Sequence, residues 1–276
     1  MLAWLLEALQ PMNRTRVKQL LRRGQVSVNG TATTRHDYRL CPGDRVVIAH
    51  QGSVSAGRDL EKAGMSIVME DDTLVVIDKP PGLLTVATES ERTDTAFARL
   101  KAHLMARGLS RPFVVHRLDR ETSGLLLFSR SAAVRDHLQA NWGAVTKTYF
   151  AVVEGMPREA EGLVENYLLE GRDLRVRVVP GGVGAKLAAT RYRVMATHGR
   201  YTLLQVVLGT GRKHQIRVHL TGLGCPVIGD LVYGSASNPA GRLGLHAGRI
   251  ALNHPKTRQR LELESPLPAT LRRVLG

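Results

Sequence analysis

The spacing of hydrophobic residues changes along the chain and predicts two differently built units. Apolar residues recur at helical spacing over Leu2–Leu9 and again over Val17–Leu21, and Pro11 separates the two segments, so we predict two short helices. Apolar and polar residues then alternate from Val26, and Asn29-Gly30 is a strong signal for a tight hairpin turn. We therefore expect a compact helix–helix–hairpin unit at the amino terminus.

Beyond residue 65 the pattern is dominated by short apolar runs typical of strands. The predicted strands are Ser66–Met69, Leu74–Asp78, Phe113–Val115, Leu125–Ser129, Thr148–Glu154, Leu174–Val179, Thr190–Met195 and Tyr201–Leu208, and the predicted helices are Ala96–Arg107, Ala132–Asn141 and Lys213–Leu220. Strands outnumber helices and do not alternate with them as βαβ units, which favours an α+β fold with a mixed, largely antiparallel sheet.

The segment His50–Gly64 separates the two patterns. It is rich in glycine, serine and charge and has no hydrophobic period, which is typical of a linker. We therefore predict a small α/β domain over residues 1–55, a linker over 56–65, and a larger domain over 66–276.

The chain carries a large surplus of positive charge. Its 39 Lys and Arg residues exceed its 24 Asp and Glu residues, which gives a formal net charge of +15. Unpaired charges are rarely buried, so the surplus must lie on the surface, where a polyanion is its natural partner. A membrane is disfavoured, because no apolar run reaches the roughly 18 residues that a spanning helix needs. Nucleic acid is therefore the expected partner.

The amino terminus and the cysteines bear on the cellular compartment of the protein. Met1–Gln10 is apolar but lacks a basic leader and a small-residue cleavage site, so we expect no signal peptide and a cytoplasmic protein. Cys41 and Cys225 are far apart and without CxxC spacing, which argues against a disulfide scaffold and a structural zinc site. We expect both to be buried thiols.

Positive charge is concentrated on the second predicted helix. Arg14, Lys18 and Arg22 follow one another at i, i+4 and i+8, with Arg16 and Arg23 beside them. A solvated helix face could have this composition, but a stripe of like charges repels itself and usually has a partner. Over residues 1–55, eight basic residues face three acidic ones, a balance of +5. This basic stripe therefore favours RNA binding.

Two polar clusters could carry chemistry. The segment His116–Gly124, HRLDRETSG, lies between two apolar runs, and functional residues prefer such loops. Within it Asp119 is close in sequence to two arginines, and an opposite charge at ~4 Å stabilises an ionised aspartate by about 4 kcal/mol at an effective dielectric of about 20. The segment Gly209–Leu220 passes from a Gly-rich turn into a predicted helix, where Lys213 and Arg217 share a face and can aim a cation at the loop carboxylate.

These two clusters resemble the hallmark motifs of the RluA-type pseudouridine synthases, cofactor-free isomerases that convert selected uridines in RNA to pseudouridine. Three further segments resemble family motifs in the same order, and two amino-terminal segments resemble the S-four RNA-binding domain of many members. The first three are Val76–Val86, Lys147–Gly155 and Gly244–Ala247 with His254-Pro255, and the other two are Arg14–Gly30 and Pro42–Ile48. A lone loop aspartate is more often a turn residue, but this ordered set reverses that interpretation.

The resemblance assigns roles to several residues. It implies that Asp119 is the catalytic carboxylate, that Tyr149 lies under the target base, and that Arg217 pairs with Asp119. Arg117 matches the arginine that fills the space of the extruded base, and Arg212 and Lys213 are expected to contact RNA. Lys79 and His116 are weaker candidates. The route stays open, because Asp119 could attack the anomeric carbon, remove the 2′ proton, or attack the uracil ring.

Other interpretations of the same residues are weaker. Gly181–Lys186 lacks Walker spacing, and His214 and His219, five positions apart, would not share a helical face, so we expect no metal and no cofactor. The alternatives are a non-catalytic RNA-binding protein, an RNA methyltransferase, for which a glycine-rich nucleotide loop is missing, and a nucleoside hydrolase. We expect a monomer that acts on ribosomal RNA or transfer RNA rather than on DNA, with a modest preference for ribosomal RNA.

Overall fold

The structure is a computed structural model. It describes residues 1–10, 12, 14–22, 26–48, 60, 64–88, 91 and 93–276, and it leaves undescribed the side chains of Arg16, Gln19, Arg22, Ala32 and Ile48. Of the expected features, Arg23, Gly24 and most of the linker lie outside the described residues.

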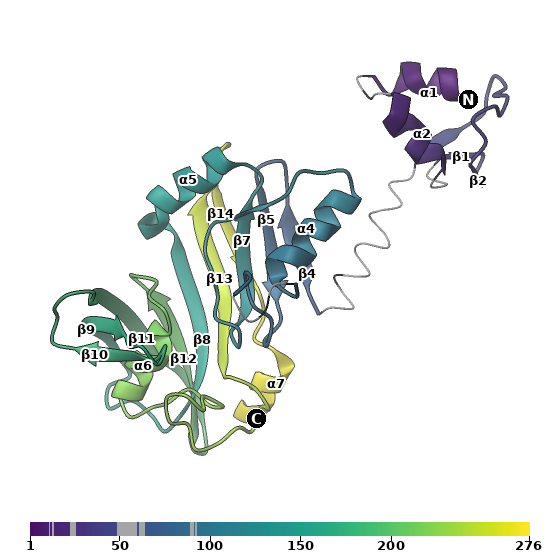
Figure 1. The fold of residues 1–276 in the computed structure, drawn as a ribbon. Coiled ribbons are helices and arrows are strands. Elements are labelled where there is room, and N and C mark those ends of the chain that lie inside the picture. The colour runs from purple at the N-terminus through teal and green to yellow at the C-terminus, as the bar shows by residue number, and fades with distance from the viewer. Residues whose placement is uncertain are drawn as a thin grey trace.

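The amino-terminal unit consists of two helices and a small sheet (Figure 1). Its elements are α1 (Leu2–Ala8), α2 (Arg14–Arg22), β1 (Val26–Val28), β2 (Thr31–Thr33) and β3 (Val46–Ile48), with strand order β2-β1-β3. Asn29 and Gly30 both have positive φ, 52° and 84°, as a type I′ hairpin turn requires. Leu5, Val17 and Val26 pack together in a core of their own. The predicted helices and hairpin are confirmed.

The rest of the chain is built on one large sheet of 11 strands. Their bounds are β4 (Ser66–Glu70), β5 (Leu74–Lys79), β6 (Phe113–Val114), β7 (Ser123–Ser129), β8 (Thr146–Glu154), β9 (Glu161–Glu170), β10 (Val176–Val179), β11 (Lys186–His198), β12 (Tyr201–Leu208), β13 (Leu245–Asn253) and β14 (Arg260–Glu264). The order is β10-β9-β11-β12-β8-β13-β7-β5-β4, with β14 on β13 and β6 on β7. The pair β13–β7 is parallel, and the other recorded strand pairs of this sheet are antiparallel. The predicted α+β class with a mixed, largely antiparallel sheet is confirmed.

Helices cover both faces of the β5–β7 half of this sheet (Figure 1). These two helices are α4 (Ala96–Ala106) and α5 (Ala132–Ala140). Elsewhere, α6 (Gln215–Gly222) lies against β10 and β11, and α7 (Ala269–Arg272) lies near the carboxyl terminus, with 3-10 turns at Trp142–Ala144 and Arg273–Leu275. Leu126 of β7 packs with Leu100 of α4, whereas Leu127 packs with Leu138 of α5. Because successive strand residues point to opposite faces, the continuous apolar run of β7 is buried on both sides.

Several predicted boundaries differ from the structure for tertiary reasons. Strands β9, β13 and β14 were not predicted, and β11 is longer than the predicted Thr190–Met195 because it pairs with β9 along one edge and β12 along the other. Helix α6 begins at Gln215 rather than Lys213, because His214 has φ 52° and cannot continue a right-handed helix. Pairing with a distant strand carries no local signal, so such elements are hard to predict.

The structure also tests the predictions made for the two cysteines. Cys225 is buried as predicted, but Cys41 is exposed, so that prediction was wrong. Cys41 begins the turn before β3, where loop backbone meets solvent.

Among the described residues, no helix has the length and apolarity needed to cross a membrane, and no three metal-ligating side chains of this part of the chain lie together.

Candidate active site

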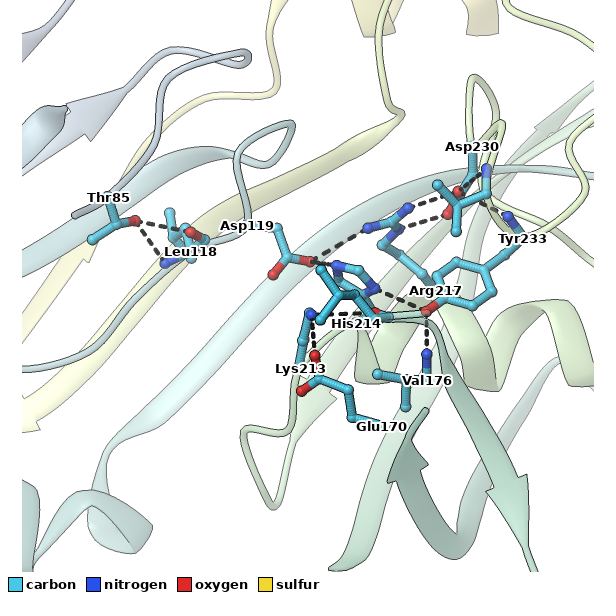
Figure 2. A network of polar contacts seen from close by, with 12 residues as sticks. Thr85, Leu118, Asp119, Glu170, Val176, Lys213, His214, Arg217, Asp230 and Tyr233 are labelled. Atoms are coloured by element: carbon cyan, nitrogen blue, oxygen red, sulfur yellow. Dashed lines mark hydrogen bonds and ion pairs between the residues drawn. The ribbon is translucent and has the colours of Figure 1, made fainter. Parts of the chain in front are cut away.

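Asp119 lies in the loop between β6 and β7, and two buried side chains fix that loop on either side of it. Thr85 Oγ1 donates to Leu118 O (2.8 Å) and accepts from Leu118 N (3.1 Å), as Figure 2 shows. Lys79 Nζ donates to Arg120 O at 3.0 Å. The backbone on either side of Asp119 is thus held by partners 33 and 41 positions earlier in the chain.

Lys79 is fully buried and acts as a clamp. Its ammonium donates to three carbonyls, those of Pro80 (2.9 Å), Leu83 (2.8 Å) and Arg120 (3.0 Å), which uses all three N–H groups. Burial lowers the pKa of Lys79 to about 7, although Glu121 and Asp119 oppose this shift. Lys79 therefore positions the loop and does not line the pocket.

Replacement of Lys79 by methionine is expected to lower the free energy of unfolding by about 3 kcal/mol, because one buried and two partly buried carbonyls lose their donor at about 1–3 kcal/mol each. Urea denaturation measures the change. Lys147→Met is the matched control, since this buried lysine donates to a single carbonyl, that of Trp142, and should cost no more than about 1.5 kcal/mol. Equal costs for the two variants would contradict the clamp.

Arg217 projects from α6 between two aspartates (Figure 2). Its Nε and Nη2 donate to the two oxygens of Asp230 at 2.7 and 2.8 Å, while its Nη1 lies 3.8 Å from Asp119 Oδ2. Burial disfavours the charge on Arg217, but the bond to Asp230 more than offsets this and raises its pKa. Asp230 was not singled out from the sequence, because only the fold brings it to α6.

Tyr149 lies on β8 and faces the same space. Its side chain is largely buried, and Ala151 and Val153 of the same strand continue that face into the core. Burial, together with the charge of Asp119, raises the pKa of the Tyr149 phenol, so the ring is neutral at physiological pH. A neutral aromatic face beside a carboxylate is suited to stacking against a base.

His214 completes the surroundings of the carboxylate. Its Nε2 lies 4.0 Å from Asp119 Oδ2, and its Nδ1 lies 2.8 Å from the hydroxyl of Tyr233. Burial lowers the pKa of His214, Asp119 opposes the shift, and Arg217 and Lys213 reinforce it. The sequence suggests no role for this histidine beyond that of a metal ligand, which its spacing from His219 argues against. Its contact with Tyr233 spans 19 positions and has no local signal.

A pocket of about 80 Å³ brings these residues together. The predicted residues that line it include Asp119, Tyr149, Arg217, Arg117 and Arg212, and the walls also include Leu118, Thr122, Leu208, Gly211, His214, Gln215, Ile216 and Leu245. The pocket therefore combines a carboxylate, an aromatic ring, apolar walls and cations.

The remaining predicted residues lie elsewhere. Lys213 does not line the pocket but pairs with Glu170 at 2.5 Å. His116 accepts from Leu127 N at 3.0 Å, and burial lowers its pKa to about 3, so it is a neutral packing residue. Arg14 and Lys18 are exposed on α2, whereas Arg23 and the side chains of Arg16 and Arg22 lie outside the described residues.

Gly124 allows β7 and β13, the two strands next to the Asp119 loop, to approach each other closely. Gly124, at the start of β7, has φ +109°, and a Cβ there would lie 2.3 Å from Ala247 O. This close approach occurs where β7 and β13 pair in parallel, with Ala247 opposite Gly124. A side chain would push apart the two strands that support the Asp119 loop.

Comparisons with known proteins agree with this geometry. A family described as RNA pseudouridylate synthase matches residues 73–221. The uncharacterized RNA pseudouridine synthase YlyB of Bacillus subtilis (strain 168) is 33% identical over 95% of this chain and 88% of its own. Ribosomal large subunit pseudouridine synthase D of Nitrosomonas europaea is 34% identical over 98% of this chain and 82% of its own. The solved structure of human RNA Pseudouridylate Synthase Domain Containing 4 has a TM-score of 0.64 at 26% identity and covers 80% of this chain and 94% of that one. The matched residues 73–221 include Asp119, Tyr149 and Arg217.

Proposed function

Because this chain belongs to the RluA-type RNA pseudouridine synthase family, and is thus an isomerase that converts uridine in RNA to pseudouridine, we propose that it modifies ribosomal RNA with Asp119 as its catalytic carboxylate. The observation that carries this proposal is the shared pocket of Asp119, Tyr149 and Arg217. A relative that is 34% identical is named for the large ribosomal subunit, which favours ribosomal over transfer RNA.

The target uridine must leave its helix to reach Asp119. Flipping a base costs a few kcal/mol, and stacking on an aromatic ring returns about 1–3 kcal/mol per base. Tyr149 offers the ring at the pocket wall, and the exposed Arg117 stands at the same pocket, where its side chain can occupy the space that the flipped base leaves. Together they offset most of the cost of extrusion.

The reaction exchanges one glycosidic bond for another. The bond between ribose C1′ and uracil N1 breaks, the ring turns, and C1′ joins C5, which releases the C5 proton as N1 gains one. Asp119 acts ionised, either on C1′, on the 2′ proton or on the ring, and Arg217 at 3.8 Å stabilises its charge. Apolar walls such as Leu118, Ile216 and Leu245 limit water, which would hydrolyse the detached sugar.

The amino-terminal unit serves as the RNA-binding domain of the S-four type in this proposal. It spans residues 1–55, joined by the linker 56–65 to the catalytic domain 66–276, and the protein works as a monomer. Arg14 and Lys18 lie exposed one turn apart on α2, and Val17 between them is buried in the unit's core. The core anchors the helix and leaves its basic face available to phosphates.

The double variant Arg14→Ala with Lys18→Ala removes both charges and is expected to weaken RNA binding. The slope of log K against log salt concentration should also become less steep by about 1.5, because each phosphate contact contributes about 0.7–0.9 to that slope. Filter binding over a range of salt concentrations measures this. Arg158→Ala with Arg272→Ala removes the same charge from exposed positions of the larger unit and should change the slope less. Identical slopes for the two double variants would contradict a specific role for α2.

Tritium release from RNA labelled at uracil C5 tests the proposed function. Ribosomal and transfer RNA transcripts are compared with wild-type protein, and Asp119→Asn serves as the inactive control. We expect release from ribosomal RNA. Release from transfer RNA alone would reassign the substrate, and no release from either RNA by folded wild-type protein would overturn the proposal.

A further inference from the structure

Two hydrogen bonds and one longer polar contact lead from the sheet to the catalytic carboxylate (Figure 2). The backbone N–H of Val176 on β10 donates to the hydroxyl of Tyr233 at 2.9 Å, and this hydroxyl lies 2.8 Å from His214 Nδ1. On the other side of the ring, His214 Nε2 lies 4.0 Å from Asp119 Oδ2. These contacts connect four residues from four separate segments of the chain.

The hydrogen bonds of Tyr233 determine which ring nitrogen of His214 carries the proton. Because Tyr233 already accepts a bond from Val176, its own hydrogen needs an acceptor, and among the described residues His214 Nδ1 is the one recorded. If Nδ1 were protonated instead, the half-buried hydroxyl hydrogen would lose its partner, and the lone pair of Nε2 would face a carboxylate. Both effects favour the tautomer with hydrogen on Nε2.

Burial has the largest influence on the pKa of His214 and favours the neutral ring. Arg217 and Lys213 act in the same direction, whereas Asp119 and, more weakly, Asp230 attract a proton to the ring. Tyr233 meets the ring edge-on, with centroids 5.5 Å apart. A neutral ring with a single outward N–H therefore faces the carboxylate.

Resting on the proposed function, we propose that His214 is a positioning residue whose Nε2–H, fixed by Tyr233, orients Asp119 through Oδ2 and leaves Oδ1 to react. Arg217 Nη1 approaches the same oxygen, at 3.8 Å. Among the described residues, neither side-chain oxygen of Asp119 accepts a hydrogen bond in the free protein, and both nearby nitrogens approach Oδ2. Catalytic hydrogen bonds are often long in the free enzyme and shorten when substrate binds, so two donors on one oxygen determine which oxygen faces the ribose.

The proposal is tested first by nitrogen-15 NMR of the histidine side chains of the full-length protein, with His214 assigned by its loss in His214→Gln. We expect hydrogen on Nε2 in wild type and a loss of this fixed tautomer in Tyr233→Phe. A hydrogen on Nδ1 of wild-type His214 would overturn the proposal.

Single-turnover kinetics at saturating RNA provide the second test. His214→Phe keeps a ring of similar size but has no N–H, and we expect a rate about 10- to 100-fold lower with RNA affinity within threefold. His214→Gln, whose amide nitrogen reaches the position of Nε2, should recover to within about fivefold of wild type. A wild-type rate for His214→Phe, or equal loss of rate and affinity in both variants, would overturn the positioning role. If wild-type protein itself were inactive on RNA, the proposed function would fail instead.

Discussion

Asp119→Asn is expected to lower the rate of pseudouridine formation by at least about 10⁴-fold, the size of effect seen when a group that takes part in bond exchange is removed. The amide carries no charge and cannot act as a nucleophile or a base. Stability should change little, because the Asp119 side chain is 28% exposed and its two nearest side-chain nitrogens, those of Arg217 at 3.8 Å and His214 at 4.0 Å, lie beyond hydrogen-bond distance.

Tritium release measures the rate of pseudouridine formation in Asp119→Asn, and the thermal unfolding temperature measures its stability. Glu121→Gln is the matched control, since it removes the same charge from an exposed position of the same loop and should retain activity within a few-fold. Activity in Asp119→Asn close to that of Glu121→Gln would mean that another group performs the reaction.

Asp230→Asn is expected to cost both stability and rate. Asp230 is fully buried and holds Arg217 through two short bonds, and removing one partner of a buried ion pair typically costs about 3–5 kcal/mol. Arg217 would also lose the anchor that keeps Nη1 beside a single oxygen of Asp119. We therefore expect a rate at least about 10²-fold lower even under conditions where the variant is folded.

A chemically similar pair on the surface controls for this effect. Arg177 also donates two hydrogen bonds to one carboxylate, that of Asp173, at 3.0 and 2.5 Å, but both side chains are about half exposed. Asp173→Asn should therefore cost less than about 1 kcal/mol. The double variant Arg217→Met with Asp230→Leu should regain part of the lost stability and none of the activity. Equal costs for the two asparagine variants would show that burial of the Arg217 pair has no energetic role.

The local patterns were sufficient for much of the fold. Alternating apolar residues located most strands to within a few positions, and Asn29-Gly30 predicted its hairpin. The missed strands exist through pairing that a local pattern does not show: β13 pairs with β8, far back in the chain, and β9 pairs with β10 on one edge and β11 on the other. Helix α6 begins two residues late because the left-handed backbone of His214, bonded to Tyr233, ends the turn before it.

The sequence by itself determined the α+β class, the family and the grouping of Tyr149 and Arg217 with Asp119, because motif residues and hydrophobic periods are local properties of a chain. Only the tertiary structure decided how these residues act on one another. It gave Arg217 a buried partner in Asp230, turned Lys79 into a clamp on the Asp119 loop, and placed His214 beside the same carboxylate oxygen. These relations join residues 13 to 95 positions apart, and such contacts are set by sheet pairing and burial, which no short stretch of sequence encodes.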